Sequence, residues 1–185
     1  PGERNARTRH NVGWRVLAAL EQRWRCESAE RTELYTTRRA EVADRNVVLM
    51  WPLTYMNESG QALVTWLEHN PTEESEVLVV SDDVYLPTGT IRFRPQGSSG
   101  GHRGLESIEA SLATRGFARL RIGVGETQGA ELREHVLEGF EPDEEAVMEE
   151  VIPRAAEAVE CWVIDGIGAA MNRFNRRANK EAEAP

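Results

Sequence analysis

Polar side chains that could take part in chemistry gather in four clusters of this sequence, several of them directly after apolar runs. In open α/β sheets, ligands bind where strands end and loops begin, so residues placed there are candidates for a functional site. The four clusters are Thr-Arg-His-Asn at 8–11, Thr-Tyr-Met-Asn-Glu-Ser-Gly at 54–60, Ser-Asp-Asp at 81–83 and Gly-Ser-Ser-Gly-Gly-His-Arg-Gly at 97–104.

His10 and Asp82 are the two residues in these clusters that best suit acid–base chemistry. A carboxylate that binds one imidazole nitrogen fixes the tautomer of the ring and leaves the other nitrogen free to accept a proton. The alternative is structural, because a histidine before a helix is commonly a cap or a surface residue and an aspartate at a strand end commonly forms a turn. The pair is therefore a hypothesis that requires the two side chains to touch in the fold.

The sequence does not favour covalent or metal-dependent catalysis. It has no Gly-x-Ser-x-Gly motif, and neither Cys26 nor Cys161 lies in a turn beside a histidine, so no covalent nucleophile is indicated. The histidines lack the paired spacing that holds a metal; they are His10, His69, His102 and His135. We expect no metal and no cofactor, and we expect the cysteines to be separate, reduced core residues.

Two further features could bind a phosphate or a bulky substrate. The Gly-rich loop at 97–104 opens onto a helix, so its backbone N–H groups could hold an anion, although it lacks the lysine of a P-loop. Arg92 and Arg94 alternate with apolar residues, which places their guanidinium groups on one strand face about 7 Å apart. The alternatives are a flexible connection for the loop and a solvated face for the arginines.

Composition and charge exclude several classes of protein. The chain has 185 residues, 40% hydrophobic and 29% charged, without the run of about 18 apolar residues that a membrane span needs and without a signal peptide. The net charge is −9, so any nucleic-acid site must be a local arginine patch on an acidic body. Lys180 is the only lysine among 22 Lys and Arg residues. Arginine codons of a GC-rich genome and adaptation to high salt both account for this bias.

The elements that must position these side chains alternate between helices and strands. Apolar periodicity predicts helices over 11–25, 59–70, 105–112, 144–164 and a short stretch around 167–174. It predicts strands over 34–39, 42–49, 77–80, 91–94 and 119–124. This alternation predicts an α/β fold, with a single domain over 1–175, a twisted, mixed and mostly parallel sheet, and helices on both faces. The polar tail at 176–185 is expected to fray.

Five blocks in order along the chain carry a resemblance to a known family. They are Thr-Arg-His-Asn-Val-Gly at 8–13, Pro-Leu-Thr-Tyr-Met-Asn-Glu-Ser-Gly at 52–60, Leu-Pro-Thr-Gly at 86–89, Gly-Ser-Ser-Gly-Gly-His-Arg-Gly-Leu-Glu-Ser-Ile at 97–108 and Arg-Leu-Arg-Ile-Gly-Val-Gly at 119–125. Over 1–174 the sequence resembles bacterial-type peptidyl-tRNA hydrolase. The resemblance implies a monomeric, cytoplasmic α/β enzyme that cleaves the ester between a peptide and the 3′ end of tRNA.

The resemblance also implies roles for individual residues. In the family, the histidine that matches His10 is the general base that activates water, and the aspartate that matches Asp82 orients it. The matched blocks contain five residues expected to bind the peptide and the 3′ end, namely Asn57, Tyr55, His102, Asn11 and Arg103. The matched basic positions expected to contact tRNA phosphates are Arg92, Arg94 and Arg121.

The sequence departs from the family pattern in several places. It opens on the turn pair Pro1-Gly2, where the family has a strand and an asparagine, so we expect an N-terminal strand to be missing from this chain. Asn5, Tyr85 and Arg103 stand where the family usually has tyrosine, an acid and asparagine. Two alternatives to the hydrolase remain. One is a non-catalytic RNA-binding protein of the same fold, and the other is an unrelated α/β hydrolase.

Overall fold

The computed structural model of the chain describes residues 7–27, 29–127 and 132–175. Its α-helices are α1 (Val12–Trp24), α2 (Ser59–Leu67), α3 (Arg103–Leu112), α4 (Leu132–Leu137) and α5 (Pro142–Phe174). Its strands are β1 (Ala29–Arg31), β2 (Tyr35–Val42), β3 (Arg45–Pro52), β4 (Leu78–Asp83), β5 (Ile91–Arg94) and β6 (Ala118–Gly123). Three 3₁₀ turns complete the described fold, namely η2 (Arg9–Asn11), η3 (Met56–Glu58) and η4 (Glu74–Glu76).

The predicted α/β class with a mixed sheet is confirmed, but the described strands form two three-stranded sheets instead of one. One sheet has the order β1-β2-β3 and is antiparallel throughout, and the other has the order β4-β6-β5. Only β4 and β6 pair in parallel, so the expectation of a mostly parallel sheet is wrong. The reason is local, because β2 and β3 are joined by a two-residue turn, and such a turn allows only antiparallel pairing.

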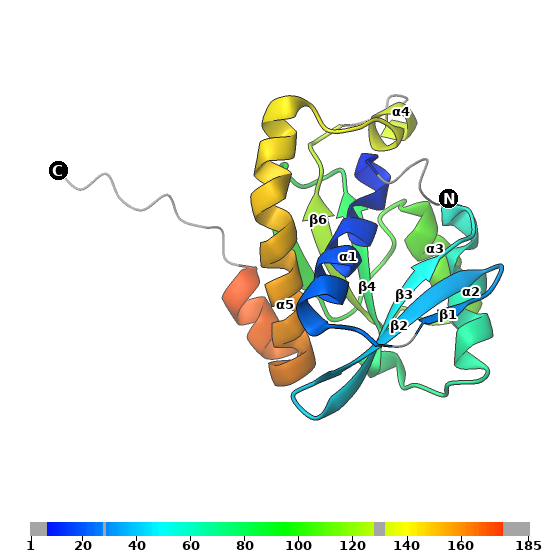
Figure 1. Ribbon diagram of the computed structural model, residues 1–185. Helices are drawn as coiled ribbons and strands as arrows, with labels where there is room; N and C mark the ends of the chain where they lie inside the picture. Colours follow the sequence, from blue (N-terminus) through cyan, green and yellow to red (C-terminus); the bar gives the residue numbers. More distant parts are fainter. Residues whose placement is uncertain (1–6, 28, 128–131, 176–185) are drawn as a thin grey trace.

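Helices cover both faces of the second sheet, as the sequence predicts. Figure 1 shows α5 and α1 side by side on one face, where they pack in the largest hydrophobic cluster together with Leu78 and Val80 of β4. Val77 and Val79 point the other way and pack with residues of α3 such as Leu105. Successive side chains of β4 therefore alternate between two cores, which fixes the direction in which the end of this strand projects its polar residues.

Several element boundaries differ from the predictions. The bend between the second and third strands lies at Ala43 and Asp44, whose φ angles of 48° and 62° form the turn, and not at 40–41. The last predicted helix is confirmed as a separate segment, because Gly166 (φ 82°) interrupts α5 between the two predicted pieces. Neither β1 nor α4 was predicted. Pro1, Asn5 and the tail at 176–185, on which the remaining predictions depend, lie outside the described residues.

A large cavity separates the two sheets and leads to the polar clusters. Within the part of the chain that the structure describes, β3 pairs only with β2 and β4 pairs only with β6. The space between their facing edges belongs to a cavity of about 1520 Å³. Leu78, Val79 and Val80 line it and are only half-buried, although an all-apolar strand predicts full burial. The cavity lining extends to the carboxyl end of β4, where the site residues gather.

Candidate active site

His10 is carried by η2, the 3₁₀ turn that leads into α1, and its neighbour Arg9 anchors this turn. The buried guanidinium of Arg9 donates to a carboxylate oxygen of Glu144 at 2.6 Å and to the carbonyl of His135 at 3.2 Å. It also lies over the ring of Phe140, 5.4 Å from the centroid. The backbone around His10 is therefore tied to the start of α5, more than 120 residues away in sequence.

The hypothesis that His10 and Asp82 touch is confirmed by the geometry. Asp82 is 3% exposed at the end of β4, and its Oδ1 lies 2.8 Å from Nδ1 of His10. Because a carboxylate accepts hydrogen bonds, Nδ1 is the nitrogen that donates. The remaining nitrogen, Nε2, has no hydrogen-bond partner among the described residues, and His10 lines the cavity. The ring thus has the tautomer that a general base needs.

Asp82 is shared by a second histidine. Nε2 of His102 lies 3.0 Å from the same Oδ1, and the centroids of the two imidazole rings are 4.9 Å apart. Burial alone raises the pKa of Asp82, but the adjacent ring of His102 and the hydrogen bonds that the carboxylate accepts from both rings outweigh burial and hold that pKa far below its ordinary range. Asp82 is therefore a carboxylate at every pH at which the protein would work.

His102 also caps a helix, which fixes its protonation. Its Nδ1 accepts the backbone N–H groups of Gly104 at 3.1 Å and Leu105 at 3.2 Å, at the start of α3. Burial lowers the pKa of His102 and the charge of Asp82 raises it by more, yet a proton on Nδ1 would remove both capping bonds. The geometry thus stabilises a neutral ring that donates from Nε2 to Asp82. Both of its nitrogens are engaged within the protein.

The same tautomer bears on metal binding. Nitrogen and oxygen atoms of His10, Asp82 and His102 lie within 4.8 Å of one another, a spacing that could hold an ion. A metal needs the lone pair of Nε2 of His102, and that nitrogen carries the proton as long as Nδ1 accepts from the helix. Metal binding would therefore remove the hydrogen bonds by which His102 caps α3. These three residues fit the hydrogen-bonded network better than they fit a metal site.

The predicted substrate-binding residues line the cavity around His10. They are Asn57, Tyr55, His102, Asn11 and Arg103. Asn57 is exposed, and its amide forms no hydrogen bond with any side chain or backbone group that the structure describes. Tyr55 is 65% exposed, and η3, which follows it, packs against α3. The amide and the ring are thus presented to whatever enters the cavity.

Comparisons with known proteins find relatives over almost the whole chain. A sequence model of the family described as peptidyl-tRNA hydrolase matches residues 1–183. The chain is 41% identical over 175 residues to the peptidyl-tRNA hydrolase of Syntrophomonas wolfei, with 95% of each covered. It is 45% identical over 179 residues to that of Roseiflexus castenholzii, with 95% of this chain and 83% of the relative covered.

Solved structures agree as well. A crystal structure of peptidyl-tRNA hydrolase from Acinetobacter baumannii matches with a TM-score of 0.88 at 30% identity, and the match covers 95% of this chain and 90% of that one. The chain belongs to the peptidyl-tRNA hydrolase family. The resemblance stated from its sequence motifs is thereby confirmed, and so is the mixed α/β fold that a peptidyl-tRNA hydrolase implies.

The three arginines predicted to contact tRNA differ in whether a carboxylate already pairs with them. Arg92 of β5 faces Arg121 of β6 directly in the strand register, and Arg94 lies two residues further along the same face. Arg121 forms an ion pair with the buried Asp83, with 2.9 Å between Nε and Oδ2. Arg92 and Arg94 form no ion pair with a described residue. Their guanidinium groups are therefore the ones left for an anionic partner.

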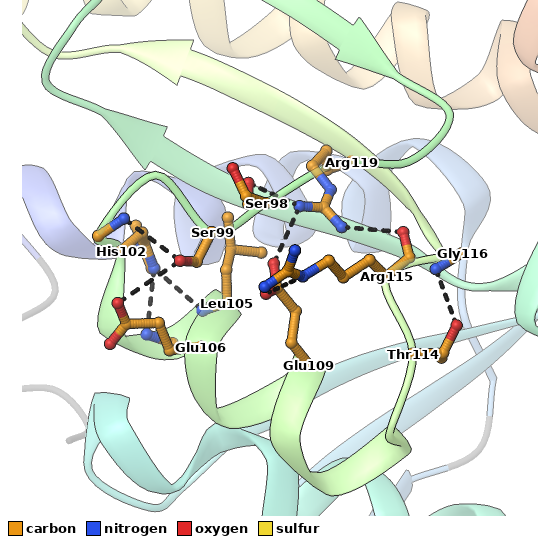
Figure 2. Close-up of polar contacts among 12 residues, drawn as sticks. Ser98, Ser99, His102, Leu105, Glu106, Glu109, Thr114, Arg115, Gly116 and Arg119 are labelled. Carbon is orange, nitrogen blue, oxygen red and sulfur yellow. Dashed lines mark hydrogen bonds and ion pairs between the residues drawn. The ribbon is translucent and has the colours of Figure 1, made fainter.

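Sequence reasoning missed Arg119, whose side chain is buried in the fold with 1% exposed. Figure 2 shows its guanidinium between the loop at 97–101 and α3, donating to the carbonyl of Ser98 at 3.1 Å and to Glu109 at 3.4 Å. It also lies 4.4 Å from the ring centroid of Phe117. Arg119 lies in the strand predicted over 119–124, where arginines alternate with apolar residues. A position in a strand does not by itself distinguish a buried arginine from an exposed one.

Proposed function

We propose that the protein hydrolyses the ester bond between the peptide and the 3′-terminal ribose of peptidyl-tRNA, with His10 as the general base. The observation that carries this proposal is the 2.8 Å contact between Nδ1 of His10 and Asp82, which leaves Nε2 without a partner among the described residues on a ring that lines the cavity. The family of named hydrolases to which the chain belongs supports a catalytic protein over a relative that only binds RNA.

The proposed reaction needs one water molecule. Nε2 of His10 takes a proton from the water while its oxygen attacks the ester carbonyl, which gives a tetrahedral intermediate. The C–O bond to the ribose then breaks, and the imidazolium returns the proton to the ribose oxygen. The products are a peptide with a free carboxyl group, which then releases its proton to solvent, and a tRNA with a free 3′ hydroxyl. The buried negative charge of Asp82 stabilises the imidazolium between these two proton transfers.

Asn57 is proposed to hold a carbonyl of the peptide. Its exposed amide can donate to an oxygen that becomes negatively charged, and an interaction that strengthens in this way lowers the barrier to reaction. The loop at 97–101 would contact the main chain of the peptide, because glycines there allow a close approach and offer no side chain. Contact with main-chain atoms alone lets one site accept peptides of different sequence.

The same contacts would exclude aminoacyl-tRNA. An aminoacyl ester lacks the first peptide bond and carries an ammonium group in its place, so a donor such as Asn57 would find no carbonyl and would face a cation. We therefore propose that the protein discriminates by the presence of an acylated α-nitrogen. Equal rates on aminoacyl-tRNA and N-acetyl-aminoacyl-tRNA would contradict this proposal.

The remaining expectations concern where the protein works and in what state. Among the described helices, none combines the length and the apolar composition that crossing a bilayer requires. We propose a monomeric protein of the cytoplasm that acts on tRNA, and the family supports the tRNA substrate. Size-exclusion chromatography with light scattering tests the monomer, and a mass of twice 20.8 kDa would contradict it.

The experiment that tests the proposed function measures release of N-acetyl-amino acid from N-acetyl-aminoacyl-tRNA, with a metal chelator present. The wild type should turn over, and His10→Ala should lose about 10²–10⁴-fold in rate, which is the typical contribution of a general base. Turnover by both proteins at equal rates would remove His10 from the mechanism. Binding of tRNA by the wild type without any turnover would favour the RNA-binding alternative.

A further inference from the structure

Tyr85 is one of the few aromatic side chains that the described fold leaves open to solvent. Its exposed fraction is 52%, whereas Val84 and Leu86 on either side are 8% and 5% exposed. It stands in the turn after β4, three residues beyond Asp82, and lines the same cavity as His10. The turn thus keeps its neighbours in the core and presents a single aromatic ring to the site.

Asp83 connects the backbone of Tyr85 to an arginine of a neighbouring strand. Its Oδ1 accepts the backbone N–H of Tyr85 at 2.9 Å, and its Oδ2 pairs with Arg121. Arg121 lies opposite Arg92 in the register of β5 and β6, so the two cationic side chains are neighbours on one face. A short row of guanidinium groups therefore ends at the turn that carries Tyr85.

We propose that Tyr85 is a stacking platform for a nucleobase in the single-stranded 3′ end of tRNA, an inference that rests on the function proposed above. Proteins that hold single-stranded nucleic acid combine cationic groups along the phosphates with aromatic rings under the bases. Here phosphates on Arg92 and Arg94 place the next base over Tyr85 and the terminal ester at His10. Since every base has a π-face, the platform accepts any nucleotide.

Asn57 and Tyr85 line the cavity from different elements. Tyr55 precedes η3 and Asn57 lies in it, and η3 packs on α3. The turn of Tyr85 packs instead against the far end of β6, where the carbonyl of Val84 accepts the N–H of Thr127. If Asn57 binds the peptide, Tyr85 faces the part of the substrate on the other side of the ester, which is the nucleotide chain.

The test measures the Kd of uncharged tRNA and of the same tRNA trimmed of its single-stranded 3′ nucleotides. Tyr85→Leu keeps an apolar side chain but removes the π-face, so it should weaken binding of the intact tRNA by about 5- to 150-fold. It should leave the Kd of the trimmed tRNA within twofold of the wild-type value. Tyr85→Phe keeps the ring and should bind both tRNAs like the wild type.

The matched control is Ile164→Ala, which removes another exposed apolar side chain, 40% exposed, that does not line the cavity. It should leave both Kd values unchanged. An unchanged Kd in Tyr85→Leu would overturn the proposal, and so would an equal loss in Tyr85→Phe, because the hydroxyl group would then be the contact. Equal weakening for trimmed tRNA would overturn it too, since the ring would not be reading the 3′ end.

Measuring KM for two substrates that differ only in the amino acid shows whether Tyr85 contacts the nucleobase or the peptide. The rise in KM of Tyr85→Leu should be the same for N-acetyl-glycyl-tRNA and N-acetyl-phenylalanyl-tRNA, and a rise that depends on the amino acid would overturn the proposal. The proposed function fails separately. A wild type that binds tRNA in the predicted pattern and releases no peptide would refute hydrolysis and leave the stacking platform intact.

Discussion

Replacing Asp82 by asparagine isolates what the negative charge of this residue does. The amide keeps an Oδ1 atom that can accept the hydrogen bonds now made by His10 and His102, at 2.8 Å and 3.0 Å. The tautomers of both rings are therefore preserved, and only the charge is removed. If Asp82 stabilises the imidazolium of His10 during the reaction, Asp82→Asn should lower kcat and leave KM nearly unchanged.

The size of the effect follows from the contact distance and the burial of the pair. Two unit charges about 4 Å apart attract by about 4 kcal/mol at an effective dielectric constant of about 20. The side chain of His10 is 16% exposed and the cavity admits solvent, so screening reduces the figure to about 2–3 kcal/mol. That free energy corresponds to a fall in kcat of roughly 30- to 150-fold.

The assay is single-turnover release of N-acetyl-amino acid from N-acetyl-aminoacyl-tRNA, with thermal unfolding measured on the same samples. Asp83→Asn is the matched control, because Asp83 is also buried at the end of β4 but pairs with Arg121 instead of His10. It should keep kcat within about threefold. A kcat of Asp82→Asn within threefold of wild type, with His10→Ala inactive, would refute the electrostatic argument.

Two further predictions concern stability. The pKa values of Asp82, Glu144 and Glu160 are lowered in the fold, so these carboxylates stabilise it at neutral pH, and that stability is lost as pH falls through the lowered values. Circular dichroism should show a Tm that falls steadily below about pH 4, and a Tm independent of pH from 7 to 2 would contradict this. Arg119→Met should lower the free energy of unfolding by about 1–3 kcal/mol in thermal or denaturant unfolding, because the carbonyl of Ser98 loses its buried donor while Glu109 keeps its ion pair with Arg115. The variant should also raise KM, because Ser98 loses its donor; an unchanged KM would remove Arg119 from positioning the loop.

How far the sequence predicts this fold depends on the range of the interactions that decide each element. The helices over 11–25 and 144–164 follow from apolar periodicity, which is local, and both are confirmed within a few residues. Ala29–Arg31 forms a strand only by pairing with β2, and all its residues are exposed, so no periodicity could indicate it. The division into two sheets depends on whether β3 and β4 pair. That long-range contact cannot be read from the sequence of either strand.

The same distinction applies to the site. Residue types alone suggested that His10 and Asp82 form a pair, and the fold brings them into contact across 72 positions. The second bond to Asp82 was not predicted, because the resemblance gave His102 a role in binding and nothing in the sequence shows that its Nδ1 caps α3. The ion pair of Arg121 was not predicted either, since only the register of β4 and β6 brings it to Asp83.

Charge pairing within the site bears on how an acidic protein would hold an anionic substrate. The chain carries a net charge of −9, and three arginines near the site are already matched by carboxylates, namely Arg9, Arg119 and Arg121. Arg92, Arg94 and Arg103 make no ion pair with a described residue. Two or three phosphate contacts give a shallow salt dependence, about 0.7 in the logarithmic slope for each contact with a single strand. The rest of the affinity must then come from contacts that salt does not screen, and an exposed aromatic ring at the end of the arginine row supplies that kind of contact.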